Sequence, residues 1–451
     1  MRSLVLLLLG SLLVVPAAGE DNAPERVRRH TLRMSYLDNG VIRLGIDLNL
    51  GGAITYLSRS GTDENVVNSY DCGRQIQMSY YSGPVPFSTG DKQPKPNWAH
   101  IGWNPIQVGD AFGNPSKVLE HRNDGKQLYV KCIPMHWPLD NVPGECTYEC
   151  WLELEGNAVH ARCRMENHRP DHTQYSARFQ EFPAIYTNGP WYRLMTYTGD
   201  QPFTGAPLAR IERDKTAPGP WSHWISPEHW AALVDDHDFG LGVWSPDFCN
   251  FDGGFAGKPG AGGPQDGPTG YIAPHALEII DWNIQHEYRY DLILGRLPDI
   301  RRYVYDHAPR PKPPVYRFEK DRQDWIYVNA TDAGWPIRGE LNILMEQNDP
   351  QLIGPVGFWQ ASDAGTLVIE AASRTKQTNA QVFWKPFGEK HFTDRNAARF
   401  QLTSDGAFHA YRLKFSNEPG WKGPITQLRF DPIGSGTAGD WIRIRSIRLE
   451  K

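Results

Sequence analysis

Within residues 41–50 every second side chain from Ile42 onward is apolar, and this pattern constrains the fold more than any other part of the chain. The apolar members are Ile42, Leu44, Ile46, Leu48 and Leu50. A period of two predicts a strand with one buried face. Gly51-Gly52 then turns the chain into a second apolar run at 53–57, and short runs bounded by Gly, Asn, Asp or Pro recur to about residue 295. Because no long stretch has a helical period, we expect an all-β protein.

The first 19 residues have the pattern of a signal peptide. Arg2 gives a positive start, residues 4–15 are an apolar run, and residues 16–19 provide small side chains for cleavage. This run is too short to span a membrane, and no later run reaches about 18 apolar residues. We therefore expect a secreted or periplasmic protein with no membrane partner.

The charge and the aromatic content of the chain narrow the class of partner. The formal net charge is −5, so no basic surface is expected to attract nucleic acid. Aromatic residues make up 12% of the chain. Most of these rings should fill β-cores, and the remainder can stack on the apolar faces of sugars. We expect a monomer that binds a polysaccharide or oligosaccharide.

A proline-rich segment at 308–315 divides the chain. Spaced prolines favour an extended, stiff conformation, so we place a linker here between domains at 25–307 and 316–451. Two short helices are predicted before it, one beginning at Ser226 and one following helical spacing from Ile300 to His307. The Gly- and Pro-rich residues 255–270 predict a long loop. Strands of the second domain are predicted at 366–371, 381–384, 398–402, 411–415, 426–430 and 441–449.

All six cysteines precede the linker: Cys72, Cys132, Cys146, Cys150, Cys163 and Cys249. Cys146 and Cys150 lie on one face of a predicted strand and are too far apart to bond each other. In an exported chain we expect them to pair with a cysteine on a neighbouring strand, Cys163 or Cys132. Zinc is the weaker alternative because no CxxC pair recurs.

Four runs near the end of the chain carry a resemblance. They are AQVFW at 380–384, DGAFHAY at 405–411, GWKGPITQLRFDP at 420–432 and IRIRSIRL at 442–449. Together they resemble the jelly-roll carbohydrate-binding-type domains of exported bacterial polysaccharide-degrading proteins. The resemblance implies a smaller C-terminal β-sandwich in a sugar context. It assigns Trp384, Trp421 and Asp431 to the core and leaves a structural calcium ion open; no other cofactor is expected.

The larger region carries a second resemblance. Its features are a strand pair through Gly51-Gly52, GRQI at 73–76, FPAIY at 182–186 and a late run into Gly295. This pattern is similar to the galactose-mutarotase-like supersandwich of aldose epimerases and of several lyases and glycoside hydrolases. The resemblance implies a large N-terminal β-supersandwich. Where small aldose epimerases place a catalytic histidine, this chain has Glu181 and residues 182–186, which argues against simple mutarotation.

The densest polar and aromatic stretch covers residues 70–81. If it is a strand, neither face is purely apolar. We expect Arg74 to clamp a substrate carboxylate in catalysis, and Gln75, Gln77 and Tyr81 to contact the sugar. The alternative is a buried structural network.

Residues 98–105 form a predicted loop with an imidazole between large rings. Such a group can act as an acid or a base near neutral pH, so His100 is a candidate catalytic histidine. Trp98, Trp103 and Asn104 are candidate substrate contacts. The alternative is a histidine that only packs and forms hydrogen bonds.

Glu181 has apolar neighbours that would raise its pKa and make it a general acid. A second carboxylate would complete a hydrolase, and the candidates are Asp252, Asp281 and Glu278. Further substrate contacts are predicted at His223 and Trp282. Because the spacing between His223 and His229 suits no metal motif, no metal site is expected.

Three functions stay open. The leading hypothesis is an exported polysaccharide-degrading enzyme, either a glycoside hydrolase or a lyase in which Arg74 neutralises a uronate. The second is a non-catalytic glycan-binding protein. The third, a sugar epimerase, has the least support because the motif histidine is missing. A catalytic site requires Arg74, His100 and Glu181 to converge within about the width of a sugar.

Overall fold

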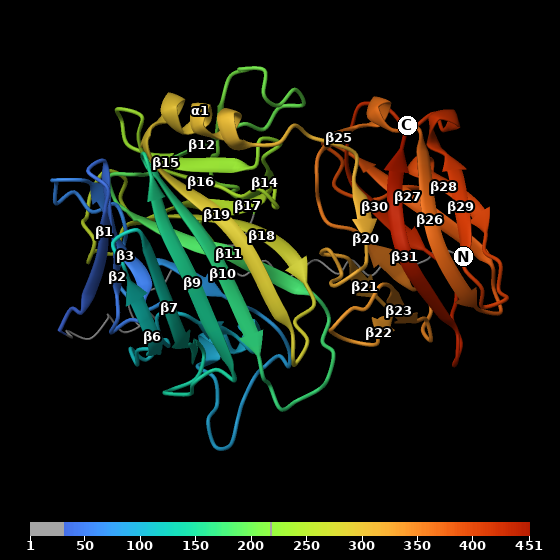
Figure 1. The fold of residues 1–451 in the computed structure, drawn as a ribbon, viewed down its shortest axis with the longest axis horizontal. Helices are drawn as coiled ribbons and strands as arrows, with labels where there is room; N and C mark the ends of the chain where they lie inside the picture. Colours follow the sequence, from blue (N-terminus) through green and yellow to red (C-terminus); the bar gives the residue numbers. More distant parts are fainter. Residues whose placement is uncertain (1–30, 217–218) are drawn as a thin grey trace.

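The computed structural model describes residues 31–216 and 219–451, so the predicted signal peptide lies outside the described residues. The chain is almost entirely β, as predicted. Its strands form two pairs of antiparallel sheets, one from residues 34–296 and one from residues 315–450 (Figure 1). Within the described ranges, no helix is long and apolar enough to cross a membrane.

Sheet 1 brings early and late parts of the first region together. Its order is β1 (Met34–Asp38), β2 (Ile42–Asp47), β3 (Ala53–Arg59), β4 (Ile76–Ser79), β11 (Arg178–Asn188), β18 (Thr269–Glu278), β17 (Asn250–Ala256) and β14 (Trp221–Ile225). The short strand β5 (Pro105–Ile106) pairs with β4 and with β8 (Met135–His136). Because β11 lies between β4 and β18, residues about a hundred positions apart become neighbours on this sheet.

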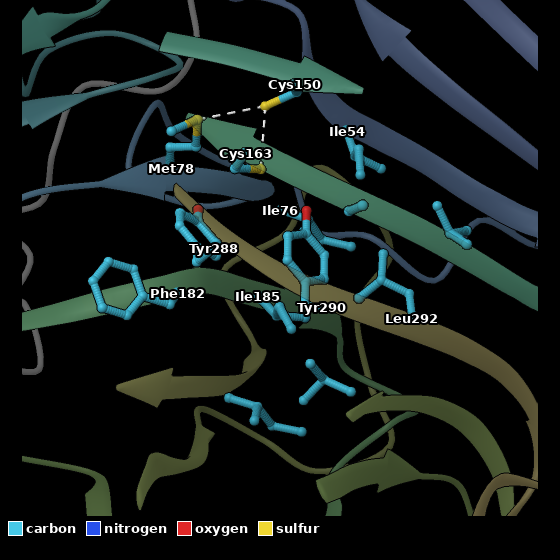
Figure 2. Packing of buried hydrophobic residues seen from close by; sticks show 14 of the residues in the cluster. Ile54, Ile76, Met78, Cys150, Cys163, Phe182, Ile185, Tyr288, Tyr290 and Leu292 are labelled. Carbon is cyan, nitrogen blue, oxygen red and sulfur yellow. Dashed lines mark hydrogen bonds between the residues drawn. The ribbon is translucent and has the colours of Figure 1, made fainter. Parts of the chain in front are cut away.

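Sheet 2 covers one face of sheet 1. Its order is β13 (Ala209–Arg210), β12 (Arg193–Thr196), β15 (Trp230–Val234), β16 (Phe239–Trp244), β19 (Gln285–Arg296), β10 (Ala158–Asn167), β9 (Cys146–Glu155), β7 (Gln127–Ile133) and β6 (Lys117–Asn123). Ile76 and Ile185 of sheet 1 pack in one buried cluster with Tyr290 and Leu292 of sheet 2 (Figure 2). Burying an aliphatic side chain of this size contributes about 1.5–3 kcal/mol.

Two smaller sheets follow the proline-rich segment. Sheet 3 has the order β22 (Thr331–Asp332), β23 (Leu341–Leu344), β31 (Trp441–Glu450), β26 (Thr366–Arg374) and β29 (His409–Lys414), with β20 (Val315–Arg317) paired to β31. Sheet 4 has the order β21 (Ile326–Val328), β24 (Gln351–Ile353), β30 (Pro424–Asp431), β27 (Asn379–Pro386) and β28 (Ala397–Gln401), with β25 (Trp359–Gln360) paired to β30. A second buried cluster fills the space between them. All six strands predicted in this region are present.

One predicted helix is confirmed and the other is wrong. The helix α1 (Leu297–His307) covers the residues with helical spacing. Ser226 instead lies in the turn between β14 and β15, where its hydroxyl accepts the Trp230 N–H at 3.2 Å. The predicted loop at 255–270 is shorter than expected because β17 continues to Ala256 and β18 begins at Thr269.

The six described cysteines are free thiols, so the predicted disulfides are not formed. Cys150 of β9 is nevertheless the direct cross-strand partner of Cys163 of β10. Their Sγ atoms are 3.5 Å apart, and Met78 Sδ lies 3.5 Å from Cys150 Sγ (Figure 2). These sulfur atoms pack as part of the larger core.

Candidate functional site

Sheet 1 has a second face that points away from sheet 2, and ionisable and aromatic side chains gather there. Ile185 and Ile272 point into the core, so their neighbours Tyr186 and Tyr271 point to this outer face. Glu181 of β11 is the direct cross-strand partner of His275 of β18. We call this surface the outer face of sheet 1.

Glu181 is held between two tyrosines. Tyr81 donates a hydrogen bond to Glu181 Oε2 at 2.7 Å, and Tyr271 donates a short one to Oε1. Burial raises the pKa of Glu181, and the two phenol hydrogen bonds offset part of this rise. The carboxyl group therefore has a fixed orientation and an increased tendency to carry a proton.

Three further groups form a compact cluster across β14, β17 and β18. His223 Nδ1 lies 3.1 Å from Asp252 Oδ1 and 3.1 Å from His275 Nε2, and His275 Nε2 lies 3.7 Å from Asp252 Oδ2. Burial alone would raise the pKa of Asp252, but the two histidines hold it well below its usual range. Burial lowers the pKa of His275, although the Asp252 charge opposes this shift. The cluster thus holds an ionised carboxylate beside an imidazole that favours its neutral form.

Aromatic rings surround these groups. Tyr271 packs against Tyr186 and against Trp221, with ring centroids 4.9 Å apart in both pairs. Phe179 meets His275 edge-on at 4.8 Å. Exposure falls from 43% for the His223 side chain to 25% for Asp252 and 2% for His275. The cluster is therefore reached from solvent at His223.

Of the predicted site residues, the structure brings Glu181, Tyr81, His223 and Asp252 together on this face. Asp252 is also the one candidate carboxylate on the same face as Glu181. Asp281 forms an ion pair with Arg322 at 2.6 Å, and Glu278 is buried with its Oε1 accepting the Ile279 N–H. Trp282 stacks on His172 at 3.8 Å, outside this group of residues.

Residues 71–75 form a turn rather than a strand. Asp71 Oδ1 accepts the Gly73 N–H at 2.8 Å, and Gln75 has a φ of 78°, which ends the extended conformation before β4. Arg74 Nε lies 3.3 Å from Asp71 Oδ2, and its Nη1 donates to the Gly267 carbonyl at 2.7 Å. Arg74, predicted to bind a substrate carboxylate, thus bonds to Asp71 and to a backbone carbonyl of the protein instead.

The two glutamines have structural partners instead of the predicted sugar hydroxyls. Gln75 Nε2 donates to the Asp71 carbonyl at 2.7 Å. Gln77 Nε2 donates to the Arg74 carbonyl at 2.6 Å, and its Oε1 accepts the Val108 N–H at 3.0 Å. Both side chains are buried, so they stabilise the turn and the strand rather than an exposed surface.

The segment around His100 forms a short 3₁₀ helix at Pro96–Ile101. His100 is exposed, and its carbonyl accepts a hydrogen bond from Arg178 of β11 at 3.4 Å. Trp98 and Trp103 are buried, and the Trp103 ring N–H donates to Glu145 at 3.1 Å. Asn104 is fully buried and donates to the Tyr80 carbonyl at 2.8 Å. Packing thus accounts for Trp98, Trp103 and Asn104, and the His100 ring stacks on Trp98 with centroids 6.4 Å apart.

Two groups at the centre of the site were missed from the sequence. Tyr271 and His275 lie at alternate positions of β18, so the same period-two reasoning used for residues 41–50 would have placed them on one face.

His229, which the sequence analysis paired with His223, lies in the turn before β15 with a φ of 61°. In the C-terminal sheets, Arg429 donates to both Asp431 carboxylate oxygens, and the structural calcium ion stays a prediction.

No protein-family model matches the chain, and no curated protein matches it. Among solved structures, it is similar to a galactose mutarotase related enzyme from Lactobacillus acidophilus, with 11% identity and a TM-score of 0.37 over 58% of this chain and 97% of that chain. A 4-alpha-glucanotransferase from Thermococcus litoralis gives 11% identity and a TM-score of 0.32 over 59% of this chain and 40% of that one.

A low affinity xylan binding module from Roseburia intestinalis gives 12% identity and a TM-score of 0.23, over 31% of this chain and 96% of that one. At such TM-scores none of these similarities carries an argument, so the description of the fold rests on its own sheets. The resemblance of the C-terminal residues to carbohydrate-binding-type domains stays a prediction.

Proposed function

We propose that this chain is a carbohydrate-active enzyme that degrades a polysaccharide or oligosaccharide on the outer face of sheet 1. One observation carries the proposal: Glu181, fixed between two phenols, is the direct cross-strand partner of His275 in the His223–Asp252–His275 cluster. Directly opposed residues have Cβ atoms about 4.5–5.5 Å apart. A proton donor and a proton acceptor therefore stand within reach of one sugar residue.

The neighbouring rings support a saccharide as the substrate. The half-buried rings of Trp221 and Tyr186 pack on the buried Tyr271 and form a continuous aromatic layer beside Glu181. The C–H face of a pyranose packs well on such rings, while its hydroxyls require the polar groups that border them. His223 and Asp252 supply those polar groups at the more exposed side.

Hydrolysis fits these positions better than elimination. Glu181 gives a proton to the glycosidic oxygen as that bond breaks. Water adds to the anomeric carbon after losing a proton to His223, which Asp252 orients through Nδ1. Glu181 faces His275 of β18 and Asp252 faces Ala273, so a strand spacing of about 4.8 Å and this two-residue offset place their backbones roughly 12 Å apart. Double displacement needs carboxyl groups about 5 Å apart, and this wide backbone spacing favours direct attack by water instead. Arg74, the residue predicted to neutralise a uronate in elimination, is instead paired with Asp71.

A sugar epimerase is the second candidate, and His275 is the observation that favours it. The sequence motif around Glu181 lacks a histidine, but β18 places one directly opposite. A carboxyl group and an imidazole facing one sugar can exchange protons with its ring oxygen and its anomeric hydroxyl without breaking a glycosidic bond.

A panel of polysaccharides and oligosaccharides tests the proposal. Reducing ends report hydrolysis, absorbance of unsaturated uronates reports elimination, and NMR of the anomeric protons reports epimerisation. We expect new reducing ends, and we expect E181Q to lower kcat by about 10²–10⁴-fold.

The matched control is H160N, because His160 pairs with Asp291 at 2.9 Å on sheet 2, outside the site. It should keep full activity. Binding without any product, or an E181Q variant as active as the parent, would rule the proposal out and leave a glycan-binding protein.

A further inference from the structure

We propose that His223, Asp252 and His275 form a binding site for one divalent transition-metal ion, with zinc the best fit. One carboxylate oxygen and two imidazole nitrogens converge here, and their ligand atoms all lie within 4.8 Å of one another. The two histidines are 52 residues apart in sequence, so the site does not correspond to a short metal-binding sequence motif.

The spacing of the ligand atoms agrees with the geometry of zinc. Tetrahedral zinc with bonds of about 2.0–2.2 Å requires ligand atoms about 3.3–3.6 Å apart. His223 Nδ1 lies 3.1 Å from Asp252 Oδ1 and 3.1 Å from His275 Nε2, and His275 Nε2 lies 3.7 Å from the other carboxylate oxygen, Asp252 Oδ2. Two imidazole nitrogens and one carboxylate oxygen would occupy three corners of a tetrahedron and leave the fourth for water or a sugar hydroxyl.

The close approach of the two imidazole nitrogens also fits a cation. His223 Nδ1 lies 3.1 Å from an Asp252 oxygen and 3.1 Å from His275 Nε2. When both ring nitrogens direct their hydrogens to the carboxylate, which can only accept, no hydrogen lies between the two nitrogens. One metal ion would accept a lone pair from each of the three groups.

Strand pairing fixes the relative positions of the three proposed metal ligands. His223 is the direct partner of Asp252 in the β14–β17 ladder, and β17 pairs with β18, which carries His275. The ligands suit zinc better than calcium or magnesium, which prefer all-oxygen sites. The partly exposed His223 lets an ion enter from solvent.

The inference deepens the proposed site, and only its catalytic consequence rests on the proposed function. In the loaded site the ion replaces the proton between His223 and Asp252. An ion held by these three residues would supply a bound water of near-neutral pKa for the attack, in place of the His223 base. Glu181 keeps its task as proton donor.

The test uses the full chain, treated with a chelator and dialysed. Calorimetric titration with zinc should show one bound ion per chain, and cobalt should give the visible absorption of a four-coordinate site. We expect H223N and D252N each to weaken zinc affinity at least tenfold, while H160N leaves it unchanged. Circular dichroism confirms that each variant is folded.

Absence of stoichiometric binding, or binding that H223N and D252N leave unaltered, would overturn the inference. The binding measurement is independent of turnover, so the two proposals fail separately. Stoichiometric zinc without activity on any saccharide supports the metal site and counts against the proposed enzyme. Activity that depends on Glu181 in a protein unable to bind zinc does the reverse.

Discussion

At the residue scale, the carboxylate of Glu228 forms hydrogen bonds with several separate segments of the chain. It is fully buried, and its oxygens accept hydrogen bonds from the Trp230 ring N–H at 2.9 Å, from Tyr305 at 2.7 Å and from the Phe203 N–H at 2.9 Å. Arg301 of α1 completes the arrangement with contacts at 2.9 and 3.2 Å. Removing one member of such a buried pair leaves the other charge without compensation.

We therefore expect E228A to lower the free energy of unfolding by about 3–5 kcal/mol, as for other broken buried ion pairs. The control is E64A, which breaks the exposed pair with Arg59, whose side chains are 56% and 52% exposed. That change should cost at most about 1 kcal/mol. Urea denaturation measures both, and equal losses would contradict the assignment of Glu228.

Single residues of the site were predicted from the sequence with mixed success, for a physical reason. Glu181 could be predicted as a candidate because its apolar neighbours are adjacent in the chain, whereas His275 acquires its partners only when three strands come together. Gln75 and Gln77 were misassigned because polarity alone does not distinguish a side chain that binds a ligand from one that bonds to a turn.

At the scale of elements, the packing of α1 on sheet 2 depends on the lack of a side chain at Gly242 of β16. A Cβ added at Gly242 of β16 would lie 2.5 Å from Ile300 Cγ2. Leu297, Ile300 and Val304 form the buried stripe of α1. The helix therefore packs directly on the strand at Gly242.

We expect G242A to destabilise the protein by about 1–3 kcal/mol through overpacking. I300A alone should cost about 2–5 kcal/mol because it leaves a cavity. The double variant G242A/I300A should lose less than the sum, since the added methyl group enters the space that Ile300 vacates. Unfolding free energies of the four proteins give the coupling directly, and strict additivity would show that the helix does not rest on Gly242.

Elements were the most predictable level because their patterns are local. Alternation identified the strands after residue 366, and helical spacing identified α1. The helix expected at Ser226 failed because the hydroxyl accepts the Trp230 N–H, which closes a turn instead of a first helical turn. Strand order was not predictable, since nothing in β4 alone specifies β11 as its neighbour.

At the scale of the whole molecule, buried charges join the two pairs of sheets. Arg322 lies 2.6 Å from Asp281 and 2.7 Å from Asp332, and all three side chains are almost fully buried. Nearby, oxygens of Glu278 and Asp324 and a ring nitrogen of His286 lie within 4.8 Å of one another. Burial raises the pKa of Asp324 to about 7, and the charges of Asp247 and Asp321 add to this rise. The sequence predicted the proline-rich segment but not these contacts.

The raised pKa of Asp324 predicts how stability depends on pH. In the unfolded chain this carboxyl loses its proton near pH 4, while the folded protein retains it until about pH 7. Its contribution is therefore complete below pH 4 and is lost as the pH rises to about 7. We expect D324N to reduce the fall in Tm between pH 4 and pH 7, whereas D63N, at an exposed position, leaves it unchanged. A D324N curve parallel to that of the parent would contradict the assignment.

The position of β31 has a consequence for how the chain folds during synthesis. This strand, Trp441–Glu450, lies between β23 and β26 and also pairs with β20. Without β31, the strands β20, β23 and β26 have no common partner and sheet 3 is divided. On the ribosome, the segments that form β20, β23 and β26 emerge well before their common partner. Their open edges must stay unpaired, or be shielded by a chaperone, until residue 450 has left the exit tunnel.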